Sequence, residues 1–255
     1  MRGFLIGALL LCACSDDANP VGAASATSGA GGFSPSVTTS SGSGSPGECS
    51  GLLPVTIRDF SLEHPDFETF HGTKAFLGIV ESTLGPDDKP VYAHTGSTKQ
   101  TTGPAEFAQW YNDVAGVNHS IPVDITLTET NPGEYVYDNP AFFPVDDQGF
   151  GNEGNEHNFH FTSEVHTSFE YQGGEVFTFT GDDDLWMFIN GRLAIDLGGL
   201  HPPLSYTADL DAIAADLGIV PGNVYPMAIF HAERHTNASN FRIQTSISCF
   251  VPPAE

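Results

Sequence analysis

Three consecutive carboxylates, Asp182-Asp183-Asp184, stand between two apolar runs, where the chain is expected to turn from one strand into the next. The nearest basic residue along the chain is Arg192, so local side chains do little to relieve their repulsion. A hard divalent cation would supply the missing charge, and Ca²⁺ accepts irregular groups of carboxylate and carbonyl oxygens. The alternative is a solvated acidic turn, because carboxylates repel only weakly in water.

The charge of the whole chain limits what else it can bind. Its 255 residues include 8 Lys+Arg and 32 Asp+Glu, for a formal net charge of -24. Binding to a nucleic-acid backbone or to an anionic membrane surface requires clustered cations, and this chain has too few. No Lys or Arg occurs between residues 100 and 191, which leaves solvent, histidine or bound metal to balance the acids there.

Other candidate chemistry is weaker. A second acidic loop, residues 146–156, is rich in Gly and oxygen donors but does not fit the spacing of an EF-hand. His157 and His160 lie three apart, and on a strand they would point to opposite faces, so packing and hydrogen-bonding roles are expected for the histidines. The sequence contains no Gly-x-Ser-x-Gly nucleophile elbow, no His-Glu-x-x-His zinc-binding helix and no phosphate-binding loop. We therefore predict a non-catalytic protein.

The elements that must position these residues are mainly strands. Alternation of apolar and polar residues, with Gly, Pro, Asn and Asp between the runs, is typical of antiparallel sheets. Asn190-Gly191 predicts a type I′ hairpin, because both turn positions need positive φ. The predicted strands are 55–60, 123–129, 158–171, 175–180, 185–189, 192–197, 225–232 and 241–247.

Two helices are expected. Pro104 opens the first, whose apolar residues recur at helical spacing up to Val114, and Gly116 stops it. A shorter one follows Asp211 and covers 212–217. The predicted fold class is all-β: an antiparallel β-sandwich with one or two short helices.

The N-terminal segment predicts export. Residues 1–13 read as a signal peptide that ends before Cys14, the pattern of a bacterial lipoprotein signal, so lipidation of Cys14 and anchoring to the outer membrane or cell surface are expected. An ordinary secretory signal is the alternative. Residues 14–50 read as a flexible Ser/Gly/Ala linker and residues 51–251 as one folded domain.

Cysteine usage predicts one disulfide. Once Cys12 has left with the signal and Cys14 carries a lipid, Cys49 and Cys249 remain at the two ends of the domain in an oxidising compartment. A bond between them would tie the termini of the domain together.

Residues 181–201, from Gly-Asp-Asp-Asp-Leu-Trp to Leu-Gly-Gly-Leu-His, resemble the fibro-slime domain, which is related to the protective-antigen (PA-fourteen) superfamily of β-sandwiches. Shorter segments extend the resemblance from about residue 55 to residue 248: 64–67, 139–144, 157–162, 232–236 and 239–241. The resemblance implies a Ca²⁺ site at Asp182 and Asp183, the pair that in the yeast adhesin branch is joined by a cis peptide and holds a Ca²⁺ that bridges sugar hydroxyls. Asp184 stands where that superfamily usually has Gly.

The expected metal ligands are therefore Asp182, Asp183 and Asp184, with Asn240 opposite them or, alternatively, capping its own turn. Trp186 and Tyr206 are candidate stacking surfaces for a sugar, although a mid-strand Trp186 also suits the core. The predicted function is a surface-tethered module that binds extracellular or cell-wall polysaccharide with Ca²⁺. The alternatives are an adhesive matrix protein that binds protein partners, with Ca²⁺ only stabilising loops, and a carbohydrate-active hydrolase.

Overall fold

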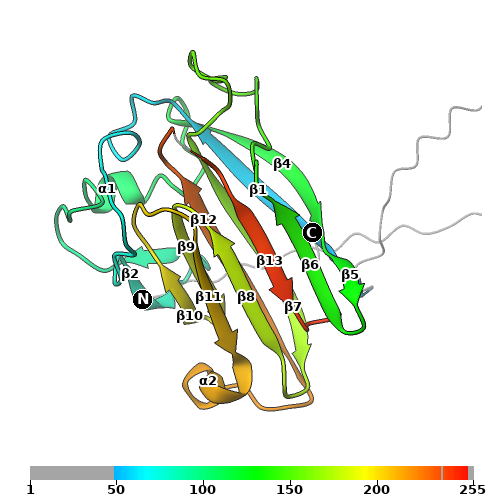
Figure 1. Ribbon diagram of the computed structural model, residues 1–255. Helices are drawn as coiled ribbons and strands as arrows, with labels where there is room; N and C mark the ends of the chain where they lie inside the picture. Colours follow the sequence, from blue (N-terminus) through cyan, green and yellow to red (C-terminus); the bar gives the residue numbers. More distant parts are fainter. Residues whose placement is uncertain (1–48, 237, 252–255) are drawn as a thin grey trace, which may run out of the picture. The chain divides into compact units, whose positions relative to one another are not determined.

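Two antiparallel sheets pack face to face in the computed structural model, which describes residues 49–251 except 237 (Figure 1). This architecture confirms the predicted all-β sandwich. The larger sheet has the order β3 (Pro90–Tyr92), β2 (Val80–Leu84), β10 (Arg192–Leu197), β9 (Asp184–Ile189), β12 (Asn223–Glu233), β7 (Phe161–Tyr171), β1 (Leu52–Phe60) and β4 (Asn118–Thr126). The smaller has the order β11 (Leu204–Asp209), β8 (Val176–Gly181), β13 (Phe241–Thr245), β6 (Glu134–Asn139) and β5 (Thr128–Asn131).

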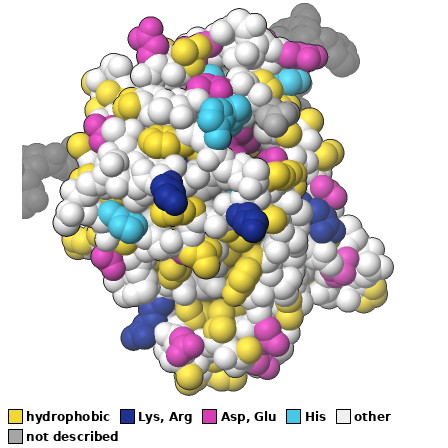
Figure 2. Space-filling view, turned by 60° about the vertical axis from the view of Figure 1, so that its left-hand side comes forward, with side chains coloured by type: hydrophobic (Ala, Val, Ile, Leu, Met, Phe, Trp, Pro, Cys, Tyr) yellow, Lys and Arg dark blue, Asp and Glu magenta, His cyan; other side chains and the backbone are white. Residues whose placement is uncertain are grey.

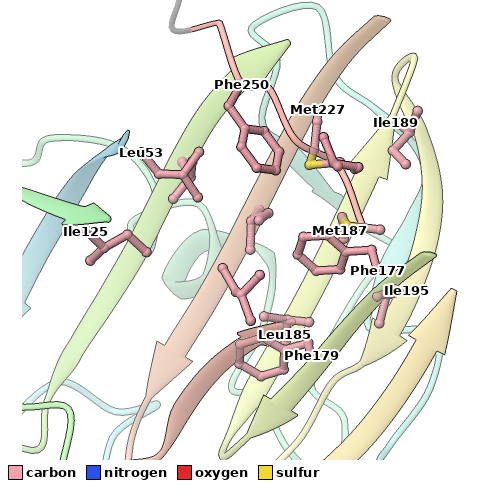
Figure 3. Packing of buried hydrophobic residues seen from close by; sticks show 14 of the residues in the cluster. Leu53, Ile125, Phe177, Phe179, Leu185, Met187, Ile189, Ile195, Met227 and Phe250 are labelled. Atoms are coloured by element: carbon pink, nitrogen blue, oxygen red, sulfur yellow. The ribbon is translucent and has the colours of Figure 1, made fainter. Parts of the chain in front are cut away.

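The main core fills the space between the sheets (Figure 3). Leu185, Met187 and Ile189 of β9 face Phe177 and Phe179 of β8 across it. The alternate residues of β9, Trp186 and Phe188, enter a second core on the outer face of the larger sheet. Both faces of β9 are therefore buried, which explains why its sequence is a continuous apolar run rather than an alternating one.

The hairpin between β9 and β10 forms where it was predicted. Asn190 and Gly191 have φ values of 52° and 70°, so both turn positions lie in the left-handed region that a type I′ turn requires. Each of the eight predicted strands corresponds to at least one observed strand, and the predicted 123–129 spans the end of β4 and the start of β5. Strands β2, β3, β6 and β11 were not predicted.

The first predicted helix is much shorter than expected. Helix α1 covers only Pro104–Phe107, and the chain continues in turns. The side chain of Asn118 donates to the carbonyls of Gln109 and Asn112 at 2.9 and 2.8 Å, and accepts from the backbone N–H of Val114 at 3.0 Å. Asn118 therefore occupies backbone carbonyl and N–H groups that would form i to i+4 hydrogen bonds in a longer helix.

The second predicted helix is confirmed as α2, Leu210–Leu217. Its N-cap is Asp209, whose carboxylate accepts from the backbone N–H groups of Asp211 and Ala212. Gly218 closes it in the left-handed conformation. Neither α1 nor α2 has the length to cross a bilayer, and the described residues contain no other α-helix.

The two ends of the described domain are joined, as predicted, by a disulfide between Cys49 and Cys249. Ser50 and Phe250 beside them also pair through their backbones, which places the first and last described segments side by side. Residues 1–13, Cys14 and the linker up to residue 48 lie outside the described residues.

A buried ion-pair group lies on the outer face of the larger sheet. Glu164 of β7 accepts hydrogen bonds from Arg58 at 2.5 Å, from His166 at 2.6 Å and from Lys89. Burial acts to raise the pKa of this carboxyl, but the hydrogen bonds from His166 and Lys89 outweigh it and lower the pKa to about 2. Lys89 lies in the turn between β2 and β3, so the group fastens that hairpin to the sheet.

This group predicts a loss of stability in acid. Because the pKa of Glu164 is lower in the folded than in the unfolded state, its contribution is complete above about pH 4.5 and disappears as the pH falls towards 2. We expect Glu164→Gln to lower the free energy of unfolding by about 2 kcal/mol at pH 7 and to make no difference near pH 2. Urea unfolding of the wild-type protein and of Glu164→Gln between pH 2 and pH 7 checks this prediction. If the free energy of unfolding of the two proteins depends on pH in the same way, the prediction is contradicted.

Candidate functional site

The acidic turn lies where β8 of the smaller sheet passes into β9 of the larger one. Gly181 ends β8, and a Cβ at this position would stand 2.3 Å from the carbonyl oxygen of Asn240, so only glycine fits. The peptide bond between Asp182 and Asp183 is cis. The turn therefore sits between the ends of the two sheets, against the loop that enters β13.

Asp182 is held by that loop. The backbone N–H of Asn240 donates to its Oδ1 at 2.6 Å, and the side-chain Nδ2 of Asn240 donates to its Oδ2 at 3.1 Å. Burial raises the pKa of Asp182, although the two bonds from Asn240 oppose the shift. Asn240 thus lies directly at the predicted site, with its amide beside the Asp182 carboxylate.

Asp183 has fewer partners. Its Oδ2 accepts a bond of 3.1 Å from the backbone N–H of Arg234. Burial raises its pKa to about 7, and the neighbouring Asp184 carboxylate adds to the shift while the Arg234 guanidinium opposes it. Among the described residues, no Lys or Arg side chain makes a salt bridge to Asp182 or Asp183. This part of the turn lacks a matching positive charge.

Asp184 is engaged elsewhere. Its Oδ2 accepts a bond of 2.7 Å from Nε of Arg234, its Oδ1 accepts from the backbone N–H of Gly199, and both ionic side chains are fully buried. Arg234 also donates to the carbonyls of Asp66 and Gln100 and lies 4.7 Å from the centre of the Trp110 ring. The expectation that Asp184 joins its neighbours as a metal ligand is corrected, because alternation along the strand turns it towards Arg234.

Asp182 and Asp183 open onto a pocket of about 250 Å³. Three histidines, His71, His201 and His235, share its lining with the two carboxylates, and Figure 2 shows histidine side chains next to acidic ones on one face of the molecule. The remaining lining residues are small or apolar: Gly72, Leu200, Pro202, Pro203 and Ala238. A space of this size accommodates a ligand as large as one sugar ring.

Two buried polar groups lie behind the pocket, on β12. His231 is fully buried, and burial lowers its pKa to about 4, so its imidazole is neutral. Glu233 is also buried, and burial, reinforced by Asp183 and Asp182, raises its pKa well above the usual value. Among the described residues, its Oε2 has no hydrogen-bond partner. These two groups thus add no positive charge to the carboxylates.

The two predicted stacking residues lie outside the pocket. Trp186 is completely buried in the second core, where its indole donates to Asp196 at 3.0 Å, so no ligand can stack on it. Tyr206 is 45% exposed on β11, the edge strand of the smaller sheet. Its strand begins directly after Pro203 of the pocket lining, but Tyr206 itself is not part of that lining.

The donor set suits a hard cation. Asp182 and Asp183 offer carboxylate oxygens to the pocket. Asn240 is not part of the pocket lining, and its amide oxygen would face Asp182 only if the amide turned by 180° and gave up its bond to Oδ2 of Asp182. Within the described residues, no three His, Cys, Asp or Glu side chains are arranged as a metal site. Two carboxylates and an amide would supply part of the six to eight oxygens that Ca²⁺ takes, and ligand hydroxyls or water would complete them.

The second acidic loop is pinned by hydrogen bonds. The buried carboxylate of Asp59 accepts from the backbone of Phe150 and from the side chain of Asn158, at 2.5 and 2.6 Å. Asp146 accepts from the backbone of Asn158 and contacts His157. The carboxylate oxygens of Asp59 and Asp146 are therefore committed to shaping the loop.

Sequence reasoning missed part of the pocket. His71, Leu200 and Ala238 come from three loops far apart in the sequence. Leu200 lies within the quoted segment 181–201, but no motif marks His71 or Ala238. His235 lies within the quoted segment 232–236, and Arg234 beside it forms a buried ion pair with Asp184.

Curated relatives come from Dictyostelium discoideum. The chain is 41% identical to protein psiR over 205 residues, which cover 74% of this chain and 20% of psiR. It is 41% identical to protein psiD over 213 residues, covering 77% of this chain and 41% of psiD. The chain thus spans less than half the length of either relative.

Solved structures give weaker likenesses. A PA14 sugar-binding domain from an RTX adhesin shares 10% identity at a TM-score of 0.31, covering 68% of this chain and 90% of that one. The PA14 domain of the MpAFP antifreeze protein shares 8% identity at a TM-score of 0.32, covering 78% and 82%. Scores this low carry no further argument. The family whose model matches is the PA14 domain, found over residues 137–250, which contain Asp182, Asp183 and Asn240.

Proposed function

We propose that this domain is a non-catalytic module of fibro-slime type that binds carbohydrate at the pocket beside Asp182 and Asp183, with a Ca²⁺ held by these carboxylates and by Asn240. The ion would supply positive charge and bind sugar hydroxyls directly. The chain's own residues hold the two carboxylates in place, orient the sugar and limit the size of the ring that enters. On this proposal Cys14 tethers the module to the outer membrane or cell surface, as the lipoprotein signal predicts.

The observation that carries the proposal is a pair of adjacent, mostly buried carboxylates at the wall of a sugar-sized pocket, to which no Lys or Arg side chain of the described residues makes a salt bridge. A buried carboxylate is costly unless it is protonated, paired or bound to metal. The pKa of about 7 at Asp183 expresses that cost. The match to the PA14 domain over this region supports the same assignment, because the resemblance seen in the sequence implies Ca²⁺ at this pair.

The test is glycan binding. We expect the domain to bind a subset of glycans on an array in the presence of Ca²⁺, and we expect EDTA to abolish the signal. Asp183→Asn keeps the size of the side chain but removes its charge, and should reduce binding by about a hundredfold or more, since it removes a charged ligand to the ion.

Asp216→Asn is the matched control, because Asp216 is exposed on α2 and its carboxylate has no hydrogen-bond partner among the described contacts. This variant should bind like the wild type. Glycan binding that survives both EDTA and Asp183→Asn would refute the calcium site. A domain that binds no glycan but still responds to Ca²⁺ would favour the adhesive matrix alternative, and turnover of a polysaccharide would favour a hydrolase.

A further inference from the structure

The end of β12 holds the Asp182–Asp183 unit through three hydrogen bonds. The Nε2 atom of His231 lies 2.8 Å from the carbonyl oxygen of Asp182. The backbone N–H of Asp183 donates to the carbonyl of Ala232 at 3.3 Å. The backbone N–H of Arg234 donates to Oδ2 of Asp183 at 3.1 Å. The C=O and the N–H of the peptide that joins the two residues are thus fixed to β12, and the Asp183 carboxylate is fixed to the residue that follows it.

Of the three groups that hold the turn, two belong to the backbone, at Ala232 and Arg234, and only that of His231 belongs to a side chain. A carbonyl oxygen accepts hydrogen bonds and cannot donate them, so Nε2 of His231 carries the proton in this contact. The other ring nitrogen lies 3.4 Å from Oγ of Ser163, whose hydroxyl donates to it. The hydrogen bonding therefore fixes the tautomer and the direction of the ring.

The surroundings of His231 also fix its position. The ring is fully buried and lies edge-on or tilted to four phenylalanines of the main core, Phe142, Phe161, Phe179 and Phe241, with centroid distances of 5.2 to 6.3 Å. Two of these come from strands of the smaller sheet, β8 and β13. His231 does not line the pocket, so it does not touch a ligand there.

We propose that His231 is a positioning residue that sets the affinity of the Asp182–Asp183 site from within the core, by holding the carbonyl between the two carboxylates at a fixed place. The inference rests on the proposed function, because it concerns the same pair of carboxylates. His231 does not line the pocket. It acts on the proposed ion ligands Asp182 and Asp183 through the carbonyl of the peptide that joins them.

The physical reason is preorganisation. An ion that needs oxygens at set distances binds best when its ligands are already in place, and residues that orient metal ligands commonly change affinity by 10- to 100-fold when they are replaced. Without the His231 donor, the buried carbonyl of Asp182 loses its partner, and the turn gains freedom to move the carboxylates apart.

The experiment compares Ca²⁺ affinity, measured by calorimetry, in the disulfide-bonded domain and its variants. His231→Phe keeps an aromatic ring among the phenylalanines but removes the donor, and is expected to weaken Ca²⁺ binding by about 10- to 100-fold. His231→Gln places an amide N–H near the same position and should recover most of the affinity. His231→Leu replaces the Phe variant if that one does not fold.

Two controls separate positioning from general loss of stability. Ile229→Val removes a methylene from the same face of the same strand without touching Asp182, and should lower the melting temperature but leave Ca²⁺ affinity unchanged. Ser163→Ala removes the partner of the other ring nitrogen and should alter affinity less than threefold.

The possible results are distinct. Equal Ca²⁺ affinity in wild type and His231→Phe overturns this inference and leaves the proposed function intact. An equal loss in His231→Gln and His231→Phe also overturns it, because a restored donor must restore affinity. A wild-type domain that binds no Ca²⁺ overturns the proposed function, and this inference with it.

Discussion

Replacing Arg234 with methionine is expected to lower the free energy of unfolding by about 3–5 kcal/mol, the usual cost of breaking a buried ion pair from one side. Arg234 is completely buried, and it is the partner of an equally buried Asp184. It also closes hydrogen bonds to the carbonyls of Asp66 and Gln100, which belong to loops outside the sheets. Its loss leaves the Asp184 carboxylate without a counter-charge and the two carbonyls without this donor.

Denaturant unfolding at pH 7 measures this effect, and two variants test its origin. Arg242→Met removes an arginine from a partly exposed pair with Asp138 and should cost less than about 1 kcal/mol. Adding Asp184→Asn to Arg234→Met should recover part of the loss, because the unpaired carboxylate is the main penalty. A cost for Arg234→Met no larger than that for Arg242→Met would contradict the role assigned to the ion pair.

The strands that the sequence predicted are those whose side chains carry their own signal. Phe241 and Ile243 alternate with polar residues, and β13 buries that face. Strands β2, β3, β6 and β11 escaped prediction because they are short or largely polar, and two of them, β3 and β11, lie at sheet edges. Pairing with a neighbour, rather than their composition, makes them strands.

The first helix shows the opposite limit. Phe107, Trp110 and Tyr111 have helical spacing and are buried, as that spacing implies, yet the helix stops at Phe107. A distant side chain, Asn118, captures the backbone groups that would have continued it. Local periodicity predicted which residues are buried but not the backbone that buries them.

The candidate site divides in the same way. Asp182 and Asp183 were predictable because adjacent carboxylates in a cation-poor sequence raise an electrostatic question that is visible in the sequence itself. Asp184 looked equivalent and is not, because its true partner, Arg234, is fifty residues away along the chain. The histidine lining and the His231 bond depend on tertiary contacts that no local pattern encodes.

Calcium is expected to stabilise the folded domain strongly. An ion that binds only the folded state adds about 4 kcal/mol when its concentration is 1,000 times its dissociation constant. For a domain of this size, that corresponds to a rise in melting temperature of about 8–16 °C. The gain has a structural source in Asp182 and Asp183, two mostly buried carboxylates with no cationic side chain paired to them among the described residues. The double variant Asp182→Asn, Asp183→Asn should lose the response.

Thermal unfolding of the wild-type domain in saturating Ca²⁺ and in EDTA is the most direct measurement of this cation site. We predict a melting temperature higher by about 8–16 °C with Ca²⁺, and no difference between the two conditions for the double variant. Identical melting of the wild-type domain with Ca²⁺ and with EDTA would contradict the account.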